Sequence, residues 1–108
     1  MSWLDFLGLR PDGDPEGMRL YASSLRASAE MIRAAGHGAA ESVHAATFVG
    51  PAGDATRARA DRLRGRASQR ADELRNLADA IDRAAGEVED DQRNWEVLKD
   101  RFWDAMPG

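Results

Sequence analysis

The two histidines are the first residues of this chain to consider as metal ligands or catalytic bases. His37 and His44 lie seven residues apart. On a helix, that spacing separates two side chains by about 10 Å, too far for both imidazoles to bind one metal ion. The chain has no cysteine, so it has no thiol nucleophile, thiolate metal site or disulfide. We therefore expect both histidines to be surface or interface residues.

Carboxylates are the other candidates for chemistry. Glu87, Glu89, Asp90 and Asp91 form an acidic cluster. A carboxylate-bridged metal centre in a helical bundle would need Glu-x-x-His pairs on facing helices, and no histidine follows His44. The chain also has no glycine-rich phosphate loop and no nucleophile elbow. We therefore expect no catalytic, cofactor-binding or metal-binding residue, and we expect that the protein is not an enzyme.

Nucleic-acid and membrane binding are not expected either. Seven arginines lie within residues 54–75, but no aromatic side chain is interleaved with them, whereas single-strand binders usually supply stacking rings. The formal net charge of −4 also disfavours a general nucleic-acid binder. No apolar run approaches the roughly 20 residues of a membrane helix. The N-terminal residues lack the basic region and cleavage site of a Sec signal peptide.

The dominant element of the chain is a long amphipathic helix, predicted over residues 54–106. From residue 74 on, its inward positions recur at steps of three and four, as in a heptad repeat: Leu74, Leu77, Ile81, Ala84, Val88, Asp91, Trp95, Leu98, Phe102 and Ala105. Asp91 is the one charged position in this stripe. It either sets register or partner choice, or marks the place where the stripe leaves the core.

A second helix is predicted over residues 14–47. Asp14 suits the N-cap and Pro15 the first helical position. Its expected inward stripe also follows steps of three and four: Met18, Tyr21, Leu25, Ser28, Ile32, Ala35, Ala39 and Ser42. A stripe of smaller residues lies beside it: Ala22, Ala29, Gly36 and Val43. Residues 1–13 form an N-terminal segment and loop, in which residues 2–9 are expected to make one or two helical turns.

Residues 48–53 are the predicted turn, with Phe48, Gly50 and Pro51 as its motif. Gly50 suits a left-handed helix end, and Pro51 suits the first turn of the next helix. We expect the Phe48 ring to pack between the two helix ends. A connection this short implies antiparallel neighbours. The predicted fold is therefore all-α, an antiparallel two-helix hairpin with a short N-terminal helical segment.

The longer helix is expected to extend beyond the shorter one. With Leu25 opposite Arg75, it runs about six turns past the start of its neighbour. The overshoot and the N-terminal segment together carry bulky residues at one end: Trp95, Leu98, Phe102, Trp103, Trp3 and Phe6. These side chains either close an intramolecular core or form a surface for a partner or a second copy. We favour the surface, because exposed aromatic side chains at core spacing usually mark contact sites.

Charge is segregated along the longer helix. Residues 54–75 carry seven arginines against four acids, and residues 79–104 carry nine acids against four bases. In an antiparallel dimer the basic and acidic ends would meet. Alternatively, the charges form a solvated face with local i,i+4 pairs.

The chain length, the two-helix hairpin, the alanine-rich core and the Phe48-Val49-Gly50 turn together resemble the WXG-motif (ESX-type) family of type VII secretion proteins. The related EspC-like group is also similar. The resemblance covers residues 15–106. Family members carry Trp where this chain has Phe48. Their C-terminal signal, Tyr-x-x-x-Asp/Glu, is absent, because Trp95 is followed four residues later by Lys99.

The resemblance implies a small helical protein that pairs into a four-helix bundle. Its partner would be a second copy, a WXG-like protein, or the N-terminal domain of a larger effector or toxin. It implies a cytoplasmic protein before export that is secreted or displayed through the type VII system, unless it is not itself a substrate. The alternative is a structural or regulatory coiled-coil module without a role in export. We also expect the hairpin to be unstable as a monomer, because an alanine-rich core buries little apolar surface.

Overall fold

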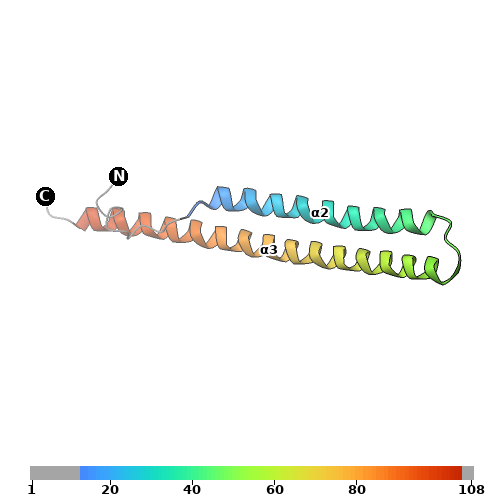
Figure 1. The fold of residues 1–108 in the computed structure, drawn as a ribbon. Coiled ribbons are helices and arrows are strands. Elements are labelled where there is room, and N and C mark those ends of the chain that lie inside the picture. Colours follow the sequence, from blue (N-terminus) through green and yellow to red (C-terminus); the bar gives the residue numbers. More distant parts are fainter. Residues whose placement is uncertain (1–12, 106–108) are drawn as a thin grey trace. The chain divides into compact units, whose positions relative to one another are not determined.

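The computed structural model describes residues 13–105, and this part of the chain is all-α. It contains two long helices and no strand: α2 spans Pro15–Ala45 and α3 spans Gly50–Ala105 (Figure 1). The expected all-α class is confirmed. The predicted N-terminal helical turns over residues 2–9, with Trp3 and Phe6, lie outside the described residues.

The chain divides into two compact units. The first, which we call the hairpin unit, is Tyr21–Asp79. The second, the terminal unit, combines Met1–Leu20 with Ala80–Gly108. Its described residues are the start of α2 and the second half of α3. Both helices therefore contribute to both units.

Asp14 starts α2 in the way its sequence predicts. Its carboxylate Oδ1 accepts a hydrogen bond of 3.0 Å from the backbone N–H of Gly17. Its carbonyl accepts the first helical bond, 2.9 Å, from the N–H of Met18. Pro15 occupies the first helical position, where its missing N–H is not needed. In the terminal unit, the carbonyl of Gly13 also accepts a 3.2 Å hydrogen bond from the Gln92 side chain on α3.

The connection between the helices is shorter than predicted. α2 ends at Ala45, and α3 begins at Gly50 rather than at residue 54. Gly50 takes the expected positive φ, 77°, a backbone conformation that residues with a Cβ rarely adopt. Pro51 follows it in the first turn of α3. Because proline is pre-set for helical φ and needs no N–H partner there, the helix starts one turn earlier than we expected.

The two helices of the hairpin unit run antiparallel. Arg26 pairs with Asp79 at 2.7 Å and Arg33 with Asp72 at 2.6 Å, so an advance of seven residues along α2 matches a retreat of seven along α3. The register differs from the expected one, in which Leu25 lay opposite Arg75. Arg75 pairs instead with Glu30. The difference arises because small residues of the two helices, and not the length of the turn, determine how the helices pack.

These small residues form the core. Fully buried positions recur every seven residues along each helix, at Ala22, Ala29 and Gly36 in α2 and at Ala71, Ala78 and Ala85 in α3. Within residues 13–105, no larger side chain is fully buried. The predicted inward stripes were therefore wrong in part, since Tyr21 is 58% and Leu77 48% exposed. Alanine and glycine let two backbones approach closely. The side of each helix that carries the small residues therefore faces the other helix, and the side with the larger residues does not.

Candidate functional site

One side of the hairpin unit is an edge of ion pairs between the helices. Four side chains of α2 pair with side chains of opposite charge on α3. The pairs are Arg26–Asp79, Glu30–Arg75, Arg33–Asp72 and His44–Asp61. All of these side chains are partly exposed, and exposed pairs contribute only about 0–1 kcal/mol each. We call this set the ion-paired edge. It orients the two helices more than it stabilises them.

Apolar side chains lie on the opposite side of the hairpin unit. Leu77 and Asp79 are the two neighbours of buried Ala78, so they project about 100° to either side of it. Asp79 belongs to the ion-paired edge, and Leu77 therefore points away from that edge. On α2, Ser28 and Glu30 are the two neighbours of buried Ala29. Glu30 belongs to the ion-paired edge through its pair with Arg75, so Ser28 points away from that edge.

We call this opposite side the apolar face. Its residues come from both helices, and each is exposed or half-buried: Tyr21, Leu25 and Ile32 of α2, and Leu63, Leu74 and Leu77 of α3. Because ion pairs join the charged sides of the helices, the two apolar sides must lie together. The hairpin unit therefore has an ion-paired side and an apolar side, with a thin core of small residues between them.

The charge pattern of α2 shows the same asymmetry. All of its acidic, basic and histidine residues follow one another at steps of three, four or seven, which places them on one stripe: Glu16, Arg19, Arg26, Glu30, Arg33, His37, Glu41 and His44. The rest of the helix surface is uncharged. A helix that faced one neighbour and solvent would carry charges more widely. The sequence contains this signal, and our prediction of the interface missed it.

The predicted turn residues lie at the closed end of the hairpin unit. Phe48 is 41% exposed, so its ring is only partly covered, contrary to our expectation of a buried anchor. It lies against Gly53, where an added Cβ would come within 2.7 Å of the Phe48 Cβ. Nη1 of Arg57 donates to the Phe48 carbonyl at 3.2 Å. The ring is exposed because α3 begins so early that the connecting residues hold it outside the helix pair.

Four of the predicted interface residues lie on α3 in the terminal unit. Trp95 is half-buried, with Lys99 Nζ 5.0 Å from its ring centroid. Leu98 is exposed, and the rings of Phe102 and Trp103 meet edge-to-face with centroids 5.8 Å apart. The other two predicted residues, Trp3 and Phe6, lie outside the described residues.

The residues first considered for chemistry are dispersed. His37 lies beside Glu41, at 3.4 Å, and Nε2 of His44 lies 2.7 Å from Oδ1 of Asp61. No group of three or more potential metal ligands occurs in residues 13–105. Nor does any helix of that range have the length and apolarity to cross a membrane.

Two carboxylates have shifted pKa values. The hydrogen bond to His44 lowers the pKa of Asp61, with nearby positive charge adding to the effect. In the terminal unit, the hydrogen bond from Arg19 lowers the pKa of Glu89 in the same way. Both carboxylates are exposed and paired, so their shifts reflect surface ion pairs between the helices and not a catalytic environment.

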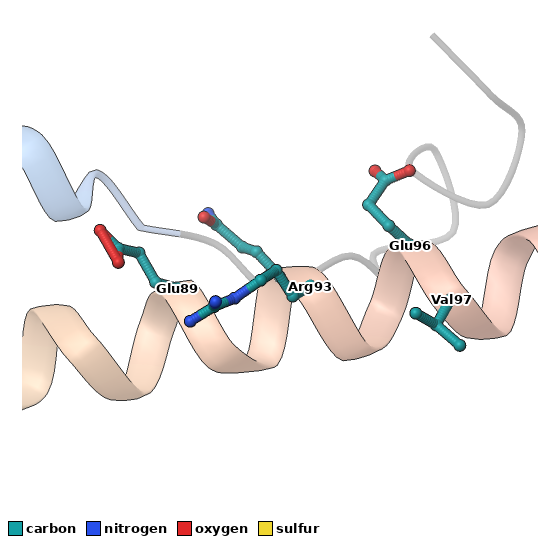
Figure 2. A pocket seen from close by; sticks show the side chains of 5 residues that line it. Glu89, Arg93, Glu96 and Val97 are labelled. Carbon is teal, nitrogen blue, oxygen red and sulfur yellow. The ribbon is translucent and has the colours of Figure 1, made fainter.

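A hollow of about 720 Å³ lies along α3 in the terminal unit, lined by Glu89, Gln92, Arg93, Glu96 and Val97. Figure 2 shows that the labelled side chains all project from this one helix. Glu89 and Arg93 already have ion-pair partners, Arg19 and Asp90. The hollow therefore presents no convergent set of free polar groups for a small molecule.

Comparison with family models, curated proteins and solved structures finds no match for this chain. The apolar face and the charge pattern around it are therefore the observations from which a function is inferred.

Proposed function

We propose that this chain is a small partner-binding protein of type VII secretion, which packs its apolar face against a second helical hairpin and so completes a four-helix bundle. One observation carries this proposal. The uncharged surface of α2 continues onto apolar residues of α3 on a single side of the hairpin unit, opposite the ion-paired edge. Partly exposed apolar side chains on adjacent helices indicate a contact surface.

The energetics favour such packing. Fully burying a large apolar side chain that was exposed contributes about 1.5–3 kcal/mol. Tyr21, Leu63 and Leu77 are each about half exposed, so each gains on the order of 1 kcal/mol when covered. The hairpin alone buries mainly alanine and glycine, and a second layer of helices supplies the burial that it lacks.

The link to type VII secretion rests on the resemblance of the hairpin and of its Phe48-Val49-Gly50 turn to WXG-type proteins. The chain lacks the Tyr-x-x-x-Asp/Glu signal, so its export depends on the partner that it binds. A tagged copy should reach the culture medium only when the partner and the membrane ATPase of the system are both present. Equal export after deletion of that ATPase gene would favour the alternative, a coiled-coil module unconnected with secretion.

Two neighbouring residues test the apolar face. Ile32 lies on this face, whereas Met31, which is 72% exposed, points to the far side of α2. Ile32→Glu and Met31→Glu make the same chemical change one residue apart. We expect Ile32→Glu to abolish association in light scattering and in native co-purification, and Met31→Glu to leave it intact. Equal behaviour of the two variants, at unchanged helicity, would refute the proposed surface.

A further inference from the structure

The arginines in the first half of α3 fall into two groups. Those of the first group have acidic partners within the chain, and they are Arg57, Arg64, Arg70 and Arg75. Those of the second group have no ion pair or hydrogen bond with any side chain of residues 13–105, and they are Arg59, Arg62 and Arg66. The second group follows at steps of three and four, so its members share one side of the helix. We call these three residues the arginine stripe.

The hairpin unit supplies no acid to neutralise the arginine stripe. On a helix, a side chain meets the residues three and four positions away, and none of these neighbours of Arg59, Arg62 or Arg66 is acidic. Arg62 instead has the other two arginines as neighbours, and like charges at these spacings destabilise a helix. Every acid of the hairpin unit already pairs with another basic or histidine side chain. The positive charge of the stripe therefore calls for an anion from outside the unit.

The arginine stripe lies on a side of α3 that neither the core nor the ion-paired edge uses. Arg62 projects about 200° around the helix from buried Ala60, nearly to the opposite side. The three arginines line a hollow of about 330 Å³ together with Leu63, which belongs to the apolar face and is 52% exposed. The hollow is therefore a basic surface with one large apolar side chain among its guanidinium groups.

We propose that this hollow binds an acidic amphipathic helix of a partner protein. A guanidinium group binds a carboxylate through two parallel hydrogen bonds, so each arginine of the stripe holds one Asp or Glu side chain. Arg59 and Arg66 are separated by about 10.5 Å along the helix axis. A helical ligand with acids at steps of three and four presents carboxylates at the same intervals, and an apolar residue beside them contacts Leu63.

This surface goes beyond the packing proposed for the apolar face. Because Arg62 points away from the core of the hairpin unit, a helix packed on the apolar face leaves the outer side of α3 accessible. The two surfaces share Leu63 at their border. The arginine stripe therefore gives the chain a second contact, with a partner whose chemistry is acidic.

A protein helix fits these observations better than a nucleic acid or an anionic membrane does. The formal net charge of −4 repels an extended polyanion. No aromatic ring is interleaved with the arginines to stack on bases. A helix that binds a membrane surface needs a broad apolar face beside its basic residues, whereas Leu63 is the one large apolar side chain that lines the hollow.

A synthetic peptide tests the proposal on the full chain. The probe is a labelled helical peptide of about 20 residues, in which Glu recurs at steps of three and four beside a stripe of Leu. The control peptide has Gln at every Glu position. Fluorescence anisotropy at low salt should give a dissociation constant of roughly 100 μM or below for the Glu peptide. Binding should weaken as salt is added, and the Gln peptide should bind about 10-fold or more weakly.

Matched double substitutions locate the site. Arg62→Gln with Arg66→Gln removes two charges from the hollow and should raise the dissociation constant of the Glu peptide about 10-fold. Arg83→Gln with Arg101→Gln removes the same charge from exposed arginines outside the hollow, and it should change the dissociation constant less than about twofold. Loss of like-charge repulsion should keep the stripe variant fully helical, which circular dichroism verifies.

Several results would overturn the proposal. They are no binding of the Glu peptide at about 1 mM, equal affinity of the Glu and Gln peptides, and equal affinity of the wild-type chain and the stripe variant. Tighter binding of a DNA duplex or of phosphatidylserine vesicles, lost in the stripe variant, would make the stripe a phosphate-binding surface instead. Self-association that is lost in the stripe variant would make a second copy the occupant.

A failure of this inference can be told apart from a failure of the proposed function. Ile32→Glu changes the apolar face outside the hollow, so it should leave binding of the Glu peptide unchanged. If Ile32→Glu abolishes peptide binding and the stripe variant does not, the peptide occupies the apolar face and only the arginine stripe is refuted. If Ile32→Glu leaves partner association intact while the stripe variant loses the peptide, the apolar face is refuted and the arginine stripe stands.

Discussion

At the residue scale, the two helices approach each other closely at Gly36. A Cβ built at this glycine would collide with the Cβ of Ala67, and it would also come within 3.6 Å of the Arg64 backbone. Gly38, two residues on, has nothing within 4 Å of a built Cβ. The two glycines lie in the same helix and differ chiefly in what an added methyl group would contact.

This difference predicts opposite effects of the same substitution. Gly38→Ala should raise the free energy of unfolding by about 0.5–1 kcal/mol, because alanine is the better helix former. Gly36→Ala should lower it by about 1 kcal/mol, because forcing the helices apart outweighs that gain. Urea unfolding measures both. Equal stabilisation by the two substitutions would show that the helices do not meet at Gly36.

The pair of His44 and Asp61 predicts a pH effect at the same scale. Because the pKa of Asp61 is lower in the folded chain than in the unfolded chain, its pairing stabilises the fold above the ordinary Asp pKa. That contribution disappears as the pH falls through the lowered value. An NMR titration should report a depressed pKa for Asp61, which returns toward normal in His44→Ala. An unchanged pKa in this variant would show that His44 is not the cause.

At the scale of the elements, the ends of the helices are determined by local signals. Asp14 caps α2 through the N–H of Gly17, and Pro15 follows it. At the start of α3, Gly50 supplies the positive φ and Pro51 the helical φ. Each of these signals acts within one turn of the chain. They therefore determine where a helix starts without depending on tertiary contacts.

The Asp14 cap predicts a measurable loss when its oxygen is removed. Asp14→Ala should destabilise the protein by about 1 kcal/mol in urea unfolding, because the N–H of Gly17 loses its acceptor. Asp14→Asn keeps an acceptor oxygen in the same place and serves as the matched control. Ala and Asn variants of equal stability would mean that solvent already satisfies that N–H.

At the scale of the whole molecule, the described chain has an unusually small set of buried side chains. Its fully buried positions are alanine and glycine, whose burial removes little apolar area. The larger apolar residues of the described part are half-buried or exposed. On the proposal that a second layer of helices covers the apolar face, we expect folding to be coupled to association, because that layer would contribute much of the apolar burial.

This dependence predicts a melting temperature that rises with protein concentration. Binding of a partner in excess stabilises the folded state by about 2.7 kcal/mol at 100 times the dissociation constant. For a chain of this size, that corresponds to a shift of roughly 10 °C or more. Melts followed by circular dichroism over a hundredfold range of concentration should show it. In Ile32→Glu the melting temperature should be lower and independent of concentration, and in Met31→Glu it should behave as in the wild type.

The sequence by itself determined the two helices and the start of the first. The three- and four-residue periodicity defined both helices, and Asp14 and Pro15 indicated where α2 begins, because these effects are local. Gly50 and Pro51 indicated the turn, but we expected α3 to begin at residue 54, whereas it begins at Gly50. The confinement of charge to one stripe of α2 is also visible in the sequence, and it supports the proposal that a partner covers the uncharged side of this helix.

Only the tertiary structure decided which side of each helix faces the other. Both helices carry two adjacent apolar stripes, one with larger residues such as Tyr21 and Leu77 and one with small residues such as Ala29 and Ala78. Periodicity does not distinguish them, since they are only about 100° apart. The choice depends on close contact and ion pairing between residues far apart in the chain, such as Arg33 with Asp72, 39 positions apart, and Arg26 with Asp79, 53 positions apart. Because the small residues pack inward, the larger ones are left outside, where a partner can cover them.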